Sequence, residues 1–279
     1  MRAVLLAALV VLAGCSGFAG SGDPTETVTP VPELPHEPVY PPGVTGSGVT
    51  DPGAVASAHA DEVADVSSTL LSARTVRAEN GTLLSHFTVQ VELDDDHSYR
   101  ARARTEGPAA PKFLGRPPAT AAFWSDGETY LRTLAREGTT TYDELDSGSQ
   151  VVPTWRYWTG AAAFGDRSSS ATTTIRDVLA AFTWRVGTAE RGNTTDYRLE
   201  SEAYTAGTVG PSGVTDVRNA TATVTVTEPG LVRSIRLRYV GTVDGDPVAV
   251  ERTVEYDAVG NTTVERPEWA DRAMNQTDS

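Results

Sequence analysis

The stretch Leu83-Leu84-Ser85-His86-Phe87-Thr88-Val89-Gln90-Val91-Glu92-Leu93 decides the fold class. Apolar side chains at Leu83, Phe87, Val89, Val91 and Leu93 alternate with polar ones. A period of two predicts a β-strand with one buried face and one solvated face. Asn80-Gly81, just before this stretch, is a strong signal for a hairpin turn.

Residues 99–104 repeat the pattern. Tyr99 and two alanines share one face, and Arg100, Arg102 and Arg104 share the other. We expect these arginines to pair with Gln90 and Glu92 across a strand ladder.

The C-terminal third alternates in the same way over residues 220–227, 234–239 and 248–256, with turns at Pro229-Gly230 and Asp244-Gly245. Strands with one apolar and one wet face are typical of antiparallel sheets. We therefore expect an α+β fold with an antiparallel sheet of about 9–11 strands and two helices.

The first helix is expected over residues 52–70, where Asp51 can cap, Pro52 suits the first helical position and apolar residues recur at helical spacing. The second follows Thr174 and Asp177, which resemble a capping box. Its apolar face would hold Ile175, Val178, Leu179 and Phe182. Residues 138–170 are expected to be irregular.

The N-terminus carries a targeting signal. Arg2 precedes a short apolar run, and Leu12-Ala13-Gly14-Cys15 ends this run with the only cysteine of the chain. The run has the length of a secretory signal, not of a membrane span. The motif resembles the lipobox of bacterial-type lipoproteins, which implies that Cys15 carries diacylglyceryl or palmitoyl chains. The alternative is a buried helix that ends in an inert thiol.

The lipobox sets the expected domain organisation: a signal peptide over 1–14, a lipidated cysteine and Pro-rich tether over 15–42, one α+β domain over 43–268 and a polar tail over 269–279. Two acyl chains hold a protein stably at a membrane. We expect a lipid-anchored protein on the extracellular face of the cell membrane. A single cysteine excludes an internal disulfide.

The charge balance is strongly acidic. The full chain has a net charge of −14, and 22 of its 23 basic residues are arginines. Such a surface repels nucleic acid, so we expect no nucleic-acid partner. The combination of an acidic surface and a single lysine is typical of halophilic organisms.

All five asparagines stand two positions before a threonine, with no proline between. This is the acceptor motif for N-glycosylation. The simpler interpretation is that some of them only make turns, but turn formation does not explain the threonines. The expected sites are Asn80, Asn193, Asn219, Asn261 and Asn275.

Signals for catalysis and metal binding are weak. The sequence lacks the phosphate-binding and nucleophile-elbow motifs. Asp94-Asp95-Asp96-His97 has the ligands of a hard cation, but a charged hairpin loop explains it better. His36, His59 and His86 are interpreted as solvated side chains. We expect no enzyme, no cofactor and no metal site.

Trp155, Tyr157 and Trp158 are candidates for a binding lip within residues 138–170. On an extended loop, Trp155 and Tyr157 would project to one side and Trp158 to the other. Aromatic side chains on a loop suit an apolar or glycan ligand. Alternatively, the loop folds onto the sheet and fills the core.

Two resemblances bear on function. Tyr40-Pro41-Pro42-Gly43-Val44 and Gly48-Val49-Thr50-Asp51-Pro52, after the lipobox and tether, resemble lipoproteins of halophilic archaea, a family that brings no known activity. The first helix and the hairpin Phe123 to Tyr130 resemble the LolA and LppX group of lipoprotein carriers. That group implies a half-barrel sheet whose concave face, covered by helices, holds acyl chains.

The carrier resemblance implies a lipid or another apolar ligand between the sheet and the helices. The expected lining residues are Phe87, Val89, Val91, Leu237 and Tyr239, which any core would also contain. The alternative is a non-catalytic structural or interaction component of the cell envelope, with a protein partner. A sheet without a cavity above about 300 Å³ would favour this alternative.

Overall fold

The computed structural model describes residues 38–145, 154–164, 171–191, 194–205, 209 and 213–277. The chain divides into two units, Met1–Pro38 and Val39–Ser279, and all described helices and strands belong to the second. Cys15, the tether up to residue 37, His36 and Asn193 lie outside the described residues.

One antiparallel sheet of 11 strands dominates the second unit, in the order β8-β7-β6-β5-β4-β3-β13-β12-β11-β10-β9. The strands are β3 (Ser68–Ala78), β4 (Leu83–Leu93), β5 (Tyr99–Glu106), β6 (Ala119–Ser125), β7 (Tyr130–Arg136), β8 (Thr139–Glu144), β9 (Phe182–Arg191), β10 (Thr194–Tyr204), β11 (Thr215–Thr227), β12 (Val232–Val243) and β13 (Asp246–Asp257). A separate two-stranded hairpin pairs β1 (Val44–Thr45) with β2 (Gly48–Val49). The predicted α+β class with an antiparallel sheet is confirmed.

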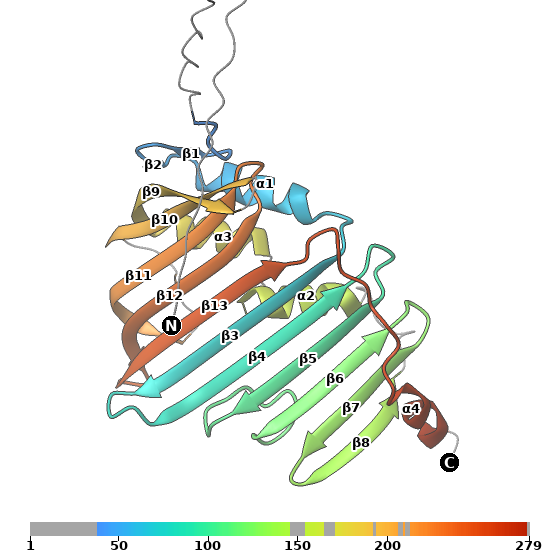
Figure 1. Ribbon diagram of the computed structural model, residues 1–279. Helices are drawn as coiled ribbons and strands as arrows, with labels where there is room; N and C mark the ends of the chain where they lie inside the picture. The colour runs from blue at the N-terminus through green and yellow to red at the C-terminus, as the bar shows by residue number, and fades with distance from the viewer. Residues whose placement is uncertain are drawn as a thin grey trace, which may run out of the picture. The chain divides into compact units, whose positions relative to one another are not determined.

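The chain enters this sheet in its middle. It runs outward from β3 to the edge strand β8, crosses to the other edge at β9, and returns through four antiparallel connections to β13 beside β3 (Figure 1). Strands β8 and β9 have one neighbour each, so the sheet is open. The first and last strands thus pair at the centre, where the two meanders meet.

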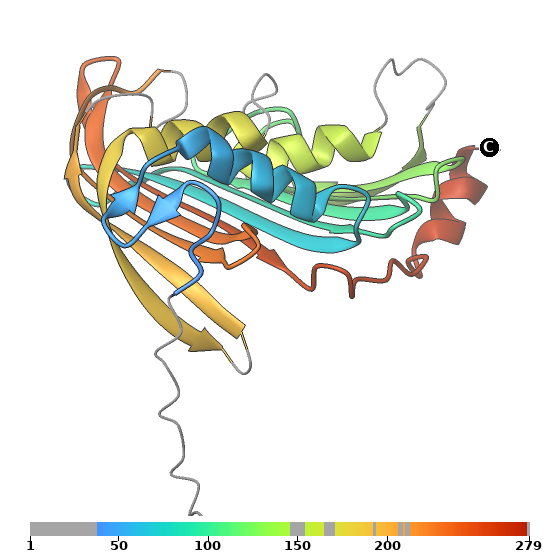
Figure 2. The same cartoon turned by 90° about the horizontal axis from the view of Figure 1, so that it is seen from above.

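Four helices occur in the described residues, not the two expected: α1 (Pro52–Val63), α2 (Thr154–Phe164), α3 (Ala171–Ala180) and α4 (Ala270–Thr277). Helices α1, α2 and α3 lie on one face of the sheet (Figure 2), which we call the inner face. Within the described part of the chain, no helix has the length and apolar character needed to span a membrane.

Helix α1 is shorter than expected. It begins as predicted, because the Asp51 carboxylate accepts hydrogen bonds from the backbone N–H groups of Gly53 and Ala54 at 2.9 and 3.0 Å. It ends at Val63, since Ala64 is already extended (φ −68°, ψ 126°) and Asp65 then has a left-handed φ of 51°. The expected continuation to Leu70 is wrong, because Leu70 belongs to β3.

The expectation of an irregular segment over residues 138–170 is also wrong where the structure describes it. Thr139–Glu144 adds β8 to the edge of the sheet, and Thr154–Phe164 forms α2. Helix α3 starts at Ala171, so Thr174 lies inside it and does not cap it. Ile175, Val178 and Leu179 are buried as predicted, whereas Phe182 begins β9.

The alternation in the sequence matches the two faces of the sheet. Val89 and Val91 on β4 and Ala101 on β5 are buried on the inner face. On the outer face, Arg100 pairs with Glu92 as predicted. Hairpin register therefore follows the period-two pattern.

Residues 269–279, expected as a polar tail, include α4. Ala270 and Ala273 of α4 are fully buried against Trp124 and Leu131, on the outer face of β6 and β7. The Arg272 guanidinium lies 5.8 Å from the ring of Tyr142 on β8. This helix covers the outer face near the β8 edge.

Candidate ligand-binding site

An apolar pocket of about 280 Å³ lies between α2 and the inner face of the sheet. We call it the α2 pocket. Its floor comes from β3, β4 and β13, and its walls and roof come from three helices. The lining residues are Val63, Ser68, Leu70, Val91, Leu93, Trp155, Arg156, Thr159, Gly160, Ala171 and Tyr256.

The strand register builds the floor of the α2 pocket. Leu70 on β3 lies opposite Val91 on β4 and opposite Tyr256 on β13, and Ser68 lies opposite Leu93. Side chains opposite one another on one face of a sheet are neighbours. Three adjacent strands therefore present one continuous apolar surface.

Helix α2 presents a mostly apolar roof. The Thr159 hydroxyl donates to the backbone carbonyl oxygen of Trp155 at 3.2 Å, so this polar group is satisfied within the helix. Gly160 has no side chain, and a Cβ built there would meet no heavy atom of the other described residues within 4 Å, apart from α2's own backbone and the adjoining residues. The space beside Gly160 is therefore open.

Trp155 is held in place by two neighbouring side chains. Its ring stacks on His97 with centroids 4.5 Å apart, and the Arg156 guanidinium lies 5.0 Å from its centroid. His97 belongs to the charged hairpin loop between β4 and β5. Asp94 of the same loop accepts hydrogen bonds from the backbone N–H groups of Asp95 and of Val264, which lies near the C-terminus. These bonds hold the pKa of Asp94 below its usual value. No cluster of metal-binding side chains occurs among the residues described.

The environment of His59 shows that its interpretation as a solvated side chain is wrong. It is fully buried on α1, and its ring meets the pocket residue Tyr256 edge-on at 4.6 Å. Its Nδ1 atom accepts a hydrogen bond of 3.2 Å from the backbone N–H of Val232. Burial lowers the pKa of His59 to about 4, so the imidazole is neutral at pH 7.

The aromatic candidates occupy three different environments, because they lie on a helix and not on an extended loop. Trp155 lines the α2 pocket, whereas Trp158 is buried with its ring 4.4 Å from that of Phe123. Tyr157 is 36% exposed. On an extended loop, Trp155 and Tyr157 would have projected to the same side, but on a helix they point in different directions.

The remaining predicted lining residues lie on the inner face. Val91 lines the α2 pocket, and Phe87, Val89, Leu237 and Tyr239 are buried on the same face outside it. Sequence reasoning missed Leu70 and Tyr256, although both fall on the apolar side of an alternating stretch. It also missed Thr159 and Gly160, because α2 was not predicted.

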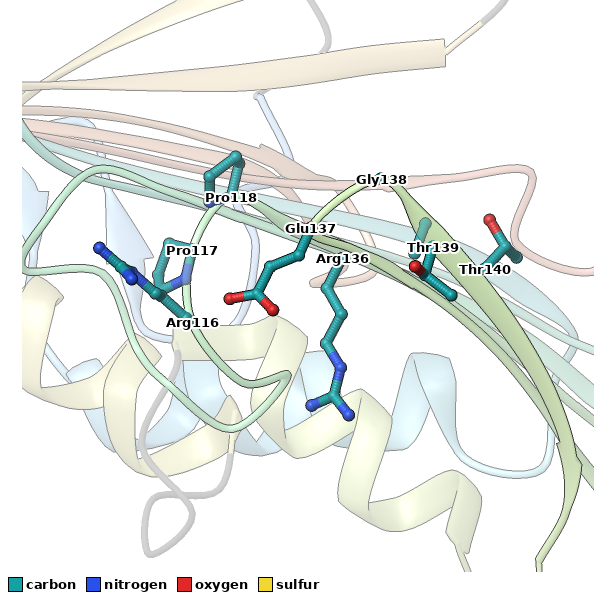
Figure 3. Close-up of a pocket in the computed structure, with 9 residues that line it drawn as sticks. Arg116, Pro117, Pro118, Arg136, Glu137, Gly138, Thr139 and Thr140 are labelled. Carbon is teal, nitrogen blue, oxygen red and sulfur yellow. The ribbon is translucent and has the colours of Figure 1, made fainter.

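The volume of the α2 pocket lies just below the roughly 300 Å³ at which ligand pockets usually begin. By volume alone, the pocket therefore favours the structural alternative, and the case for a ligand depends on its apolar lining. A larger cleft of about 620 Å³ lies between the β7–β8 turn and the loop that precedes β6. Figure 3 shows the side chain of Glu137 between those of Arg116 and Arg136 in this cleft. Its polar lining makes it a poorer match for the predicted apolar ligand than the α2 pocket.

Four of the five expected glycosylation sites are described. Asn80, Asn219, Asn261 and Asn275 are all exposed, as attachment of a glycan requires. Asn80 lies in the β3–β4 turn, where its side-chain oxygen accepts a hydrogen bond of 3.0 Å from the backbone N–H of Thr82. Turn formation thus uses the Asn80 side chain and the backbone of Thr82, but not the threonine hydroxyl.

Comparisons with known proteins add a family and distant structural likenesses. The model of a family of unknown function (DUF7537) matches residues 1–273. No curated protein matches the chain. A LolA superfamily protein from Nitrosomonas europaea is similar at 9% identity and a TM-score of 0.23, over 77% of this chain and 94% of that one.

Two further solved structures are similar at the same distance. A DUF1329 family protein from Desulfovibrio piger has 9% identity and a TM-score of 0.24, over 78% of this chain and 94% of its own. An outer membrane lipoprotein-sorting protein domain from Vibrio parahaemolyticus has 8% identity and a TM-score of 0.25, over 81% and 97%. At such TM-scores, function has to be inferred from this chain's own pocket.

Proposed function

The chain belongs to this family of unknown function, and we propose that it binds a lipid or another apolar ligand in the α2 pocket without changing it chemically. The observation that carries the proposal is the apolar space between α2 and the centre of the sheet. Leu70, Val91 and Leu93 form its floor, and Gly160 leaves its roof open.

The composition of the lining favours an apolar ligand. Most of its side chains are aliphatic or aromatic, and the hydroxyl of Thr159 is satisfied within α2. An apolar ligand gains about 25 cal/mol for each Å² that it removes from water. A pocket of about 280 Å³ suits one acyl chain or a small apolar molecule, not a folded partner.

We also propose that the protein works at the outer face of the cell membrane. Cys15 follows a signal-like apolar run, and the Pro-rich tether would separate the folded unit from the lipid headgroups. An anchor of this kind would keep the apolar site close to the lipids of the membrane. A structural role in the cell envelope, with a protein partner, is the alternative if the pocket binds nothing.

The test is binding of N-phenyl-1-naphthylamine, a neutral fluorescent probe, to the full chain with Cys15→Ser, purified without detergent in molar KCl. We expect saturable binding that dodecanol reverses. Gly160→Leu should fill the pocket and weaken binding at least tenfold, since the added side chain enters the open space beside α2.

Gly160→Ala is the matched control. It adds a Cβ that meets no atom within 4 Å and improves helix propensity, but leaves most of the pocket empty. It should bind the probe like wild type. Absence of saturable binding, or equal binding by Gly160→Leu and wild type, would contradict the proposal and favour the structural role.

A further inference from the structure

Two arginines lie side by side on the inner, apolar face of the sheet. Arg74 on β3 is directly opposite Arg252 on β13, at the centre of the sheet. Opposite side chains have Cβ atoms about 4.5–5.5 Å apart, and like charges placed in this way repel.

The inner-face neighbours of this pair give no carboxylate. The strand registers place these residues next to the two arginines: Phe87, Leu237, Ser72, Val254, Val76 and Val250. On the outer face, Arg236 and Arg238 of the neighbouring strand β12 pair with Glu255 and Glu251 of β13. Two adjacent cations among apolar neighbours are unfavourable for folding, through both charge repulsion and burial.

Burial acts on both guanidinium groups. Arg252 is 6% exposed, and burial lowers its pKa to about 10. Burial also lowers the pKa of Arg74. Each of these shifts means that the folded state penalises the positive charge, a penalty that a bound anion would relieve.

Two polar atoms beside the pair have no hydrogen-bond partner among the described residues: Nε of Arg74 and the hydroxyl of Tyr239. Tyr239 is 3% exposed and lies close enough to Arg252 and Arg74 for both charges to oppose the rise that burial causes in its pKa. Arg252 donates to the carbonyl oxygen of Val209 at 3.4 Å. Buried polar groups are normally satisfied, so unmet donors mark a place for a ligand atom.

We propose that Arg74, Arg252 and Tyr239 bind the anionic oxygen group, a carboxylate or phosphate, of the apolar ligand. Guanidinium groups hold such oxyanions through charge-assisted hydrogen bonds, and the Tyr239 hydroxyl supplies a third donor. The unmet donors and the two adjacent cations are both accounted for by one bound anion.

The position of this site fits one amphipathic molecule. Arg74 lies four positions after the pocket residue Leu70 along β3, a distance of roughly 13 Å at about 3.3 Å per residue. The acyl part would lie in the α2 pocket and the anionic group at the arginines. This inference rests on the proposed function, and it narrows the ligand to an anionic lipid.

The test uses the same probe and chain, and compares displacement by dodecanoate, dodecyl phosphate and dodecanol. In molar KCl the Debye length is about 3 Å, so surface charge contributes little. We expect at least one of the two anions to displace the probe at a concentration tenfold or more below that of dodecanol. Whichever is stronger identifies the group as carboxylate or phosphate.

In Arg74→Gln, the anion and dodecanol should displace the probe at similar concentrations, with the value for dodecanol unchanged from wild type. Tyr239→Phe should reduce the difference between the anion and dodecanol severalfold. Arg236→Gln, on the outer face, is the matched control and should behave like wild type. If the probe binds but neither anion surpasses dodecanol, or Arg74→Gln keeps the advantage, this inference is overturned and the apolar site stands. If the probe does not bind at all, both fail.

Discussion

The imidazole of His59 on α1 accepts a hydrogen bond from the backbone N–H of Val232 on β12, 173 residues later in the chain. The acceptor is Nδ1, so the ring proton resides on Nε2 and the ring is neutral. This contact attaches the first helix to the C-terminal half of the sheet, next to the pocket residue Tyr256.

Acid should destabilise the protein through His59. Its pKa falls from 6.5 to about 4 on folding, so below pH 6.5 the unfolded chain takes up a proton that the folded chain refuses. The free energy of unfolding should therefore fall between pH 6.5 and 4, by about 2.5 kcal/mol at pH 4.5. His59→Asn keeps an acceptor for Val232 but does not titrate. Denaturant unfolding at pH 7 and 4.5 should show a smaller loss for this variant, and an equal loss would contradict the assignment.

Gly43 should be intolerant of a side chain. Its φ is 78°, and a Cβ built there lies 2.2 Å from the carbonyl oxygen of Asp51. Gly43→Ala should lower the free energy of unfolding by about 3 kcal/mol. Gly81→Ala is the control, since its φ is 84° but nothing lies within 4 Å of its Cβ. It should cost about 1 kcal/mol, and equal losses in denaturant unfolding would disprove the clash at Gly43.

Arg74→Met should leave the ligand-free protein as stable as wild type or raise the free energy of unfolding by about 1–2 kcal/mol. The change removes a partly buried cation beside Arg252 and keeps an apolar side chain of similar length. Thermal and denaturant unfolding of ligand-free protein measure this. A loss above about 2 kcal/mol would mean that Arg74 holds the fold together and is not reserved for a ligand.

Cys15→Ser should release the protein from membranes. We propose Cys15, which ends the lipobox-like run, as the point of attachment of the acyl chains. Fractionation of native cells should find the wild type with the membranes and the variant in the soluble or external fraction. A variant that stays with the membranes would show that another feature anchors the chain.

Asn80 should carry a glycan. Thr82→Val removes the acceptor motif but keeps Asn80 and the backbone N–H of Thr82 that it accepts from. The intact mass of natively expressed protein should exceed the mass of the lipidated polypeptide and fall by one glycan in this variant. Equal masses for the two proteins would exclude glycosylation at Asn80.

The sheet could be predicted from the alternating pattern, because successive side chains of a strand point to opposite faces regardless of which strand pairs with it. Val89 and Val91 on β4 follow this rule. The same pattern contains a signal that attention to apolar residues alone misses: Arg252 occupies an inner position between Val250 and Val254. A charge at an apolar position of an alternating strand is a candidate functional residue.

Helix α2 could not be predicted, since its existence depends on tertiary packing. Trp158 is buried against the core, where its ring lies 4.4 Å from that of Phe123, a residue of a hairpin about 35 positions earlier. His59 was misread for a related reason. It is in contact with residues far away in the sequence: Val232 of β12, whose N–H it accepts from, and Tyr256 of β13.

The most direct measurement is mass spectrometry of the small molecules that co-purify with natively expressed protein, compared with Gly160→Leu and Gly160→Ala. We predict close to one anionic lipid per wild-type chain, the same for Gly160→Ala, and its loss from Gly160→Leu. Wild-type protein that carries no lipid, or lipid retained equally by Gly160→Leu, would contradict a ligand in the α2 pocket.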